Sequence, residues 1–514
     1  MGTTQEQPNY YEILGLAPGA TPQEIRQAYL EAVRRWHPDR NKDPEAHEVF
    51  LLVREAYEVL SNPVLRRDYD QRMGFEGPIT HTEPMTGTIP TTQVPHLRIR
   101  VSYETIPALD EPQVWYALLN ITSPWSEPEQ PHPVTLWFVL DQSNSMRKDG
   151  KMALQKAAVR TALDTLRPQD RVGLIGFHDR PRLLLPLTPV KERGTIESAL
   201  EDLRPAGGTE IALALALAWR HAQQRLSQRE VTAIWLFTDG RTYGDEEQAL
   251  QLAKQWAKAG VICDAFGLGG DWNESFLEDL TAQTGGASYF LDSETTARQI
   301  IPEKIERFHF ATVRRAQFDF SLAPQVELTG LYRMSPEVAH LPTASPVELG
   351  LVRGGERWLL LLELRLPPLQ GRVSGQTYRV LYGQVRLTPW GRGSVHEERV
   401  PLHVRLGERA PHKPPRAVRH AVERLTWYRM QRASREALHH GEPHKARALL
   451  RHLAQRLTQR GRLRAAARVK QVERRLRAGA LPSPEDEKAL EYGTRLLMLP
   501  DRADTVRRRR RTAS

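Results

Sequence analysis

The sequence contains a single cysteine, Cys263, among 514 residues. One cysteine cannot form a disulfide within the chain, nor can it build a metal cluster held by several thiolates. The chain also lacks any run of about 18 or more uncharged apolar residues, so no segment is expected to span a membrane. The first residues, MGTTQEQPNYYEIL, lack the basic and then apolar pattern of a secretory signal. These absences favour a cytoplasmic protein.

Sequence motifs of several enzyme classes are missing as well. The chain has no phosphate-binding Gly-x-x-x-x-Gly-Lys-Ser/Thr loop, no His-Glu-x-x-His pair and no Gly-x-Ser-x-Gly nucleophile turn. We therefore expect that the chain is not itself an enzyme.

Charge is distributed unevenly along the chain. The formal net charge is +10, but residues 411–514 contain 27 Lys+Arg against 10 Asp+Glu, which leaves residues 1–410 with a net charge of −7. The five arginines at 507–511 would suit nonspecific contact with nucleic-acid phosphates. No aromatic platform or recognised nucleic-acid fold accompanies them, so solvated helical faces are the preferred explanation and nucleic acid is not an expected partner.

Residues 9–73 are predicted to form four short helices. Thr21, Pro22 and Glu24 have the pattern of a helix start, with a hydroxyl cap, a proline in the first turn and a glutamate three residues after the cap. The sequence His37-Pro38-Asp39 ends that helix, because the residue before a proline is forced out of the helical region. Residues 74–96 are rich in Gly, Pro and Thr, which predicts a flexible linker that spans roughly 25 Å on average.

The pattern of apolar and polar residues divides the rest of the chain into further segments. Residues 97–133 alternate between apolar and polar side chains, which indicates half-buried strands. In residues 134–312, apolar runs such as VTLWFVL and AIWLF alternate with amphipathic stretches, which is typical of a parallel sheet covered by helices on both faces. Strand character returns at 313–410, residues 411–500 have helical periodicity, and the tail 501–514 is predicted to be disordered. We hypothesise that the strands on both sides of the α/β domain complete one sandwich.

The segment 9–73 resembles the J-domain of the DnaJ family. The resemblance rests on NYYEILGL, the capped helix, the His37-Pro38-Asp39 loop, EAYEVLSNP and RRDYD, in that order. It implies that His37, Pro38 and Asp39 contact a DnaK-type chaperone and stimulate its ATP hydrolysis, while the hydrolysis itself takes place on the chaperone.

The charge of the second predicted helix departs from the family pattern. J-domains carry a basic second helix, and the basic residues present here are Arg26, Arg34 and Arg35. More positive charge is expected where this sequence has Gln27, Leu30 and Glu31. Because surface charge mainly sets the rate of encounter, we expect stimulation of the chaperone to be weaker or more sensitive to salt.

Oxygen-bearing side chains follow the ends of the predicted parallel strands. They are Asp141, Ser143, Ser145, Thr209 and Asp239. Ligands of open α/β sheets bind at the carboxyl ends of strands, and carboxylates and hydroxyls are hard ligands that suit Mg²⁺ or Mn²⁺. Taken singly, Asp-x-Ser-x-Ser also occurs as a helix cap and Thr-Asp-Gly as a turn. Their joint occurrence at strand ends predicts a metal site.

This set of residues resembles the metal-ion-dependent adhesion site of von Willebrand factor A (VWA) domains, with every ligand position filled. The resemblance covers about residues 134–312. It implies that Ser143, Ser145 and Thr209 contact the metal directly or through water, while Asp141 and Asp239 supply charge and hold waters. It also implies that an open coordination position accepts a carboxylate from a partner protein.

Two further patterns contain residue types that occur in binding sites. Tyr243 and Trp272 lie in the segments 242–246 and 270–274, which follow two strand ends, and we expect them to be contact anchors for a partner at the rim of the site. The acidic residues of the same segments are better explained as helix caps. The histidines of HHGEPH, residues 439–444, are better explained by a turn between helices than by a metal site.

The sequence thus predicts a multidomain protein with a helical J-domain hairpin, a doubly wound α/β VWA domain inserted in a β-sandwich, and a C-terminal helical region. The expected function is that of a co-chaperone adaptor that binds a partner or client through the metal site and a DnaK-type chaperone through the J-domain. The alternative is an accessory subunit of an ATPase-driven metal-insertion or remodelling complex. A hydrolytic metalloenzyme is disfavoured, because no general base or nucleophile is evident beside the metal ligands.

Overall fold

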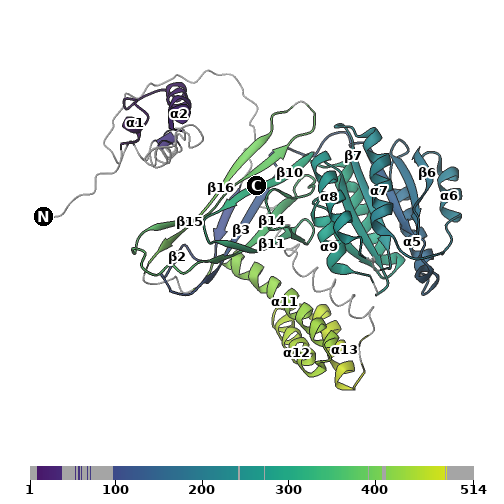
Figure 1. The fold of residues 1–514 in the computed structure, drawn as a ribbon. Helices are drawn as coiled ribbons and strands as arrows, with labels where there is room; N and C mark the ends of the chain where they lie inside the picture. Colours follow the sequence, from purple (N-terminus) through teal and green to yellow (C-terminus); the bar gives the residue numbers. More distant parts are fainter. Residues whose placement is uncertain are drawn as a thin grey trace, which may run out of the picture. The chain divides into compact units, whose positions relative to one another are not determined.

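The computed structural model describes residues 9–36, 97–240, 244–270, 272–391, 393–407 and 413–480, together with the single residues 53, 56, 57, 60, 66, 70 and 482. The chain divides into two compact units, Met1–Pro90 and Thr91–Ser514, and each is described by itself (Figure 1). Several predictions concern residues outside the described ranges. These are the His37-Pro38-Asp39 loop, the linker 74–96, Tyr243 and the tail 501–514.

The first unit contains the helices α1 (Tyr10–Ile13) and α2 (Pro22–Trp36). The predicted start of α2 is confirmed, because the Thr21 amide donates a hydrogen bond of 2.7 Å to the Glu24 carboxylate and the Glu24 amide returns one of 3.3 Å to the Thr21 hydroxyl. The described part of α2 extends to Trp36. The apolar side chains of this unit form one small core, made by Tyr11, Leu14, Ile25, Val53, Ala56 and Leu60.

The second unit contains an α/β domain whose six-stranded sheet has the order β6-β5-β4-β7-β8-β9 (Figure 1). Its strands are β4 (Val134–Asp141), β5 (Arg171–Phe177), β6 (Arg182–Pro189), β7 (Val231–Thr238), β8 (Ile262–Leu268) and β9 (Ser288–Leu291). Neighbouring strands pair in parallel except for β5 and β6. The antiparallel edge strand β6 was not predicted.

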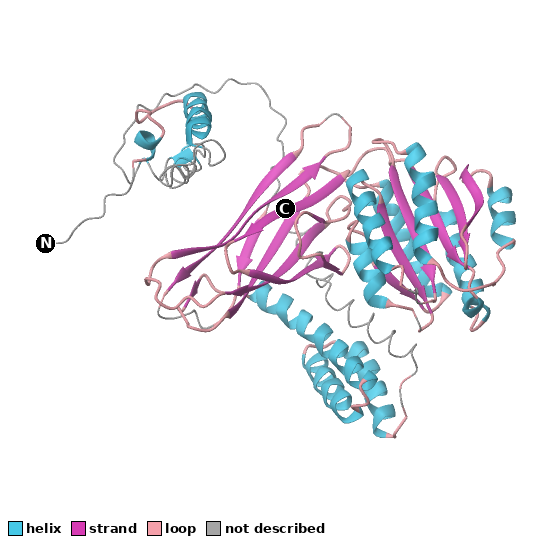
Figure 2. Cartoon of the chain, viewed as in Figure 1, coloured by secondary structure: helices cyan, strands magenta, loops and turns pink. Residues whose placement is uncertain are grey.

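Helices cover both faces of this sheet (Figure 2). They are α5 (Lys151–Thr165), α6 (Arg193–Glu201), α7 (Ile211–Ala222), α8 (Glu246–Ala259), α9 (Glu274–Ala282) and α10 (Glu294–His309). Successive side chains of β4 are buried on opposite faces: Phe138 packs in the cluster that contains α5, α6 and α10, whereas Trp137 and Val139 pack in the cluster that contains α7, α8 and α9. The prediction of a doubly wound α/β domain is therefore confirmed.

Two five-stranded sheets form the β-sandwich. The first has the order β1-β3-β14-β11-β12, with β1 (Arg98–Val101), β3 (Gln113–Thr122), β11 (Glu327–Ser335), β12 (Ala339–Leu341) and β14 (Arg357–Leu366). The second has the order β13-β10-β15-β16-β2, with β2 (Thr105–Ile106), β10 (Arg315–Leu322), β13 (Val347–Glu348), β15 (Thr377–Thr388) and β16 (His396–Leu406). The strand β3 precedes the α/β domain in sequence and pairs with β14, which follows it. This pairing confirms that the α/β domain is inserted into the sandwich.

Three helices complete the second unit: α11 (Arg416–His439), α12 (Pro443–Gln459) and α13 (Leu463–Arg477). The first part of α11 packs through Val418, Leu425 and Tyr428 against the outer side of the β3-β14-β11 sheet. Its last part joins α12 and α13 in a separate core. The predicted turn at HHGEPH lies between α11 and α12. No helix in the described part of the chain has the length and apolar character needed to cross a bilayer.

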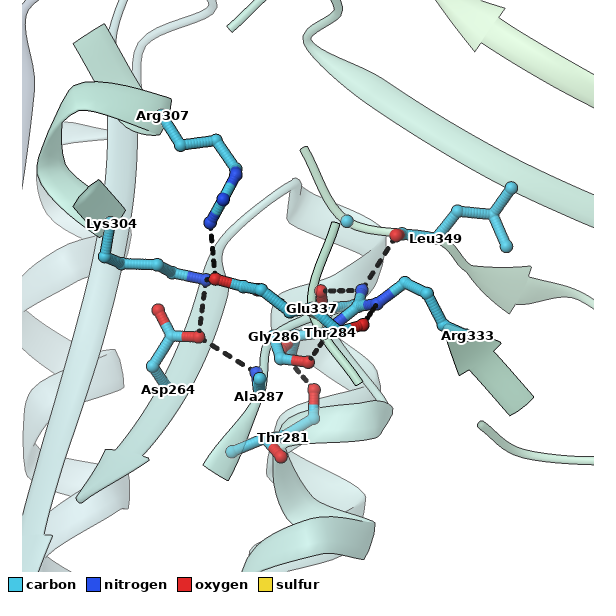
Figure 3. Close-up of polar contacts among 12 residues, drawn as sticks. Asp264, Thr281, Thr284, Gly286, Ala287, Lys304, Arg307, Arg333, Glu337 and Leu349 are labelled. Atoms are coloured by element: carbon cyan, nitrogen blue, oxygen red, sulfur yellow. Dashed lines mark hydrogen bonds and ion pairs between the residues drawn. The ribbon is translucent and has the colours of Figure 1, made fainter. Parts of the chain in front are cut away.

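A buried network of charges joins the α/β domain to the sandwich (Figure 3). Lys304 of α10 lies between two carboxylates, with Nζ 2.9 Å from Asp264 Oδ1 and 3.0 Å from Glu337 Oε2. Arg307, one turn later, binds Glu337 and also Glu356, which precedes β14. Because Glu337 lies between β11 and β12, these ion pairs attach α10 to the sandwich.

Arg333 makes the reverse connection. It comes from β11 of the sandwich, its side chain is 1% exposed, and its guanidinium donates to the carbonyl oxygens of Gly285 and Gly286 in the α/β domain at 2.6 and 2.8 Å. It also donates to the carbonyl oxygen of Leu349 at 2.8 Å (Figure 3). Its Nε donates to the carbonyl oxygen of Glu337 at 3.0 Å, so every guanidinium nitrogen has a partner, which is what burial of this charge requires.

Burial alone would raise the pKa of the Glu337 carboxyl, but Lys304, Arg307 and Arg333 hold that pKa well below its usual range. The carboxylate is therefore the centre of the network, and its removal takes one negative partner from both Lys304 and Arg307.

Replacement Glu337→Gln should lower the free energy of unfolding by about 3–5 kcal/mol, because breaking one member of a buried ion network leaves uncompensated charge. Urea unfolding of the full chain measures this. Glu327→Gln is the control, because Glu327 of β11 is exposed and forms only a 3.6 Å pair with exposed Arg365. Equal stabilities of the two variants would contradict the role given to the network.

The same network predicts an acid-sensitive contribution. A depressed pKa in the folded state means that the stabilisation by Glu337 is complete above the ordinary pKa of 4.5 and is lost as the pH falls from there toward the folded-state value. The difference in unfolding free energy between wild type and Glu337→Gln should therefore shrink between pH 4.5 and about pH 3. A difference that is constant over this range would show that the charge of Glu337 is not what stabilises the interface.

Candidate metal centre

The parallel pairing of β4 with β7 determines where the two predicted carboxylates lie. The strands are in register from Val134↔Val231 to Leu140↔Phe237, so both end at the same edge of the sheet. Asp141 is the last residue of β4, and Asp239 directly follows the last residue of β7. Two residues far apart in sequence are thus held side by side by backbone hydrogen bonds.

The loop that carries Thr209 is fixed to the loop after β4 by main-chain hydrogen bonds. The Ala206 amide donates to the carbonyl oxygen of Gln142 at 2.5 Å, and the Asn144 amide donates to the carbonyl oxygen of Gly207 at 3.1 Å. The Thr209 side chain lies against Gly240, where an added Cβ would be 3.0 Å from the Thr209 hydroxyl oxygen. Thr209 therefore packs against the residue that follows Asp239, and a side chain at residue 240 would crowd it.

Three of the predicted oxygen donors are in direct contact. The Ser145 hydroxyl lies 2.7 Å from Asp239 Oδ1 and 2.9 Å from the Ser143 hydroxyl. The Ser143 hydroxyl lies 3.4 Å from the same carboxylate oxygen. Ser143 and Asp239 are buried, whereas Ser145 is exposed. The cluster is therefore open to solvent on the Ser145 side.

Asp141 lies beneath this cluster and is fully buried. Its two oxygens accept hydrogen bonds of 2.7 Å, one from the Ser143 amide and one from the Thr238 hydroxyl. Burial raises the pKa of Asp141 to about 6, although the hydrogen bonds from Thr238 and Ser143 oppose the shift. Through the bond from the Ser143 amide, the carboxyl holds the loop after β4 in place.

Two residues of the site were missed by sequence reasoning. Thr238 orients Asp141, and Lys151, the first residue of α5, places its ammonium 2.8 Å from Asp239 Oδ2. Only a weak sequence signal points to Lys151, which directly follows a glycine at the start of the helix after the serine-containing loop. A lysine at that point is more often solvent-exposed.

The donor set has the chemistry expected for a hard divalent cation. Hydroxyl and carboxylate oxygens converge, and one side of the cluster is open, as binding of Mg²⁺ or Mn²⁺ requires. Asp141 has both oxygens occupied by protein donors, so its contribution to a cation would be charge from outside the ligand shell. Ser143, Ser145 and Asp239 therefore suit such an ion, with the Asp141 carboxylate behind them, whereas Thr209 is placed near them only by its contact with Gly240.

The prediction that Trp272 is a contact anchor at the rim is wrong. Its side chain is 2% exposed, and its indole nitrogen donates to the carbonyl oxygen of Gly269 at 3.0 Å. The ring fills the space at Gly267, where an added Cβ would lie 2.0 Å from a ring carbon. The missing side chain at Gly267 thus leaves room on β8 for the indole ring. The loop sequence around Trp272 alone does not indicate that this room exists.

The acidic residues near the rim have structural contacts. Asp245 accepts a 2.7 Å hydrogen bond from the Ala212 amide in the first turn of α7, and Asn273, rather than an acidic residue, caps α9. Cys263 is fully buried in β8, as expected for a core residue, and burial raises the pKa of its thiol.

Three segments match known family models. Residues 9–70 match the DnaJ domain, residues 136–241 match the von Willebrand factor type A domain, and residues 416–500 match the Sll0103-like, C-terminal alpha-helical domain. The chain therefore contains a J-domain and a VWA domain. A J-domain suggests a co-chaperone role beside a DnaK-type chaperone, and a VWA domain suggests protein interaction.

Among relatives, the uncharacterised protein sll0103 of Synechocystis sp. is 26% identical over 324 residues, which is 60% of this chain and 75% of that protein. The chaperone protein DnaJ of Dictyoglomus thermophilum is 60% identical over 63 residues, which is 12% of this chain. That match spans only 16% of the DnaJ protein, so the likeness is confined to the J-domain.

Solved structures share the fold of the second unit. The von Willebrand factor type A protein from Catenulispora acidiphila aligns with a TM-score of 0.59 and 16% identity over 75% of this chain and 91% of its own. The ArnB paralog VWA2 from Sulfolobus acidocaldarius aligns with a TM-score of 0.50 and 15% identity over 78% of this chain and 98% of its own. At these identities the likeness concerns the fold alone.

The slot for Trp272 gives a testable consequence. Gly267→Ala should displace the ring and lower the free energy of unfolding by about 1–3 kcal/mol, because overpacking a filled core forces side chains off their rotamers. Urea unfolding followed by tryptophan fluorescence measures this. The control is Gly194→Ala in α6, where a Cβ meets nothing within 4 Å and should not destabilise the protein. Unchanged stability of Gly267→Ala would contradict the buried position of Trp272.

Proposed function

We propose that this protein is a co-chaperone adaptor, in which the VWA domain captures a partner or client protein and the J-domain recruits a DnaK-type chaperone to it. The observation that carries the proposal is the presence, on one chain, of a J-domain segment and of converging oxygen donors at the carboxyl edge of the VWA sheet. Each domain alone suggests binding of another protein. Their presence on one chain suggests that a protein bound by the VWA domain is delivered to the chaperone.

On the chaperone side, His37, Pro38 and Asp39 form the docking loop, and Arg26, Arg34 and Arg35 steer the approach to an acidic surface. The capped start of α2 supports this assignment, because that cap is one of the features by which the segment resembles a J-domain. Catalysis of ATP hydrolysis belongs to the chaperone, and this chain supplies no catalytic group.

On the partner side, Ser143, Ser145 and Thr209 hold Mg²⁺ or Mn²⁺ directly or through water, and Asp141 and Asp239 supply the negative charge. A bound divalent ion offers a coordination position to a carboxylate of the partner. The exposure of Ser145 supports this assignment, because it leaves the cluster accessible from outside.

Linking the two modules makes their second encounter intramolecular. A flexible connection such as the predicted linker 74–96 gives an effective concentration in the millimolar range. A partner held by the VWA domain would therefore meet a recruited chaperone far more often than a free one does.

The chaperone arm of the proposal predicts that His37→Gln abolishes stimulation of a DnaK-type ATPase and leaves the melting temperature unchanged. Steady-state ATP hydrolysis by the chaperone, with and without the full-length protein, measures this. His81→Gln makes the same substitution in the segment after the J-domain and should stimulate like wild type. Full stimulation by His37→Gln would rule out the assigned docking loop. Recovery of a ring ATPase in place of a DnaK-type chaperone with the purified protein would favour the alternative, an accessory subunit of a remodelling complex.

The metal arm predicts that Mg²⁺ or Mn²⁺ stabilises the wild-type protein, by about 2.7 kcal/mol at a concentration of 100 times the dissociation constant. Ser145→Ala should weaken this effect, whereas Ser198→Ala on the exposed side of α6 should not. Thermal unfolding in EDTA and in increasing Mg²⁺ measures both variants. Absence of any cation-dependent stabilisation in wild type would refute the metal arm and leave the J-domain arm untouched.

A further inference from the structure

Lys151 is built into the candidate metal centre and is not a surface ion pair. Its side chain is 8% exposed, and its ammonium lies 2.8 Å from the fully buried Asp239 carboxylate. The aliphatic part of the side chain passes Gly269 at the end of β8, where an added Cβ would be 2.6 Å from Lys151 Cε. A side chain at residue 269 would therefore collide with this lysine.

Asp239 divides its two oxygens between two kinds of partner. Oδ2 contacts the Lys151 ammonium, whereas Oδ1 contacts the hydroxyls of Ser145 and Ser143. A fixed positive charge therefore lies on the opposite side of the carboxylate from the cluster of oxygen donors. A divalent cation held by the serines and Asp239 would share this carboxylate with the lysine.

The formal charge of the site follows from these contacts. Asp141 and Asp239 contribute two negative charges and Lys151 contributes one positive charge, which leaves a single negative unit. Among these three contacting groups, a divalent cation would bring the formal charge to one positive unit, and a positive charge attracts an anion.

We propose that Lys151 is a tethered cation that competes with the divalent ion for Asp239, so that the site binds the ion weakly alone and more tightly together with a carboxylate of the partner. This inference rests on the proposed metal-dependent function. It adds Lys151 as the residue that sets how tightly the site binds the ion. The coupling is reciprocal, because a carboxylate that favours the loaded site must raise the affinity for the ion by the same factor.

The test removes the lysine charge and measures cation binding directly. Lys151→Met keeps an aliphatic side chain beside Gly269 and eliminates the ammonium. Titration calorimetry of the full-length protein with MgCl₂ should give a dissociation constant about tenfold or more below that of wild type, because a neighbouring opposite charge shifts cation or proton binding at a carboxylate by at least about one order of magnitude. In EDTA the variant should melt at a lower temperature than wild type, since Asp239 loses its partner. Addition of Mg²⁺ should remove this difference in melting temperature.

The matched control is Lys156→Met, five residues later in the same helix. Lys156 is also largely buried but contacts Glu201 of α6, with Nζ 3.2 Å from its carboxylate. This variant has the same net charge as Lys151→Met, so it should retain the wild-type affinity for Mg²⁺. Sodium acetate, compared with sodium chloride at equal ionic strength, is the carboxylate probe. It should tighten Mg²⁺ binding to wild type more than to Lys151→Met.

The possible outcomes separate this inference from the proposed function. Tighter Mg²⁺ binding by Lys151→Met than by Lys156→Met supports the inference, and so does binding by Lys151→Met alone. Equal Mg²⁺ affinities in all three proteins overturn it, because Lys151 would then be a structural ion pair only. Absence of Mg²⁺ binding in every variant refutes the metal-dependent function itself and the inference with it. Lys151→Gln removes the same charge while keeping a hydrogen-bond donor for Asp239, and it replaces Lys151→Met if that variant does not fold.

Discussion

The parallel pairing of β4 with β7 is the constraint on which the candidate site depends. It places Asp141 and Asp239, which are widely separated in sequence, at one edge of a sheet whose interior is wholly buried. The loop that carries Thr209 then only has to be held against this edge, which two main-chain hydrogen bonds achieve. The side-chain contacts among Ser143, Ser145 and Asp239 are therefore a consequence of backbone geometry, which makes them less dependent on any single substitution in the surrounding core.

A second constraint joins the VWA domain to the rest of its unit. Because the domain is inserted between strands that pair with each other, both of its ends are anchored in the sandwich. The ion pairs of Lys304 and Arg307 with Glu337 add a fixed point on α10, and Arg333 adds one on the loop before β9. Charges buried in this manner favour one relative arrangement, because any displacement would leave cations or carbonyl oxygens without partners.

Sequence patterns predicted the architecture and the oxygen donors because both follow from local rules. Apolar runs between amphipathic stretches indicate buried parallel strands, and the strand ends then indicate where Asp141 and Asp239 lie. The position of Lys151 did not follow, because nothing in its neighbourhood distinguishes a lysine that enters a site from one that faces water. The burial of Trp272 also required information from elsewhere, since the slot it fills is made by Gly267 of β8. Likewise Arg333 and Glu337 look like ordinary surface charges until the two domains are placed together.

The 24-residue helix α11 belongs to two cores at once. From Val418 to Tyr428 the helix covers Leu118, Tyr332 and Leu361 on the outer side of a sandwich sheet. Trp427 in its middle and Ala437 near its end belong to the three-helix core. Truncation just before this helix would expose a hydrophobic patch on the outer face of the β-sheet, and exposed patches of this kind promote aggregation. The helical region therefore also acts as a cover for the sandwich, and its loss would reduce solubility before it affected the VWA edge.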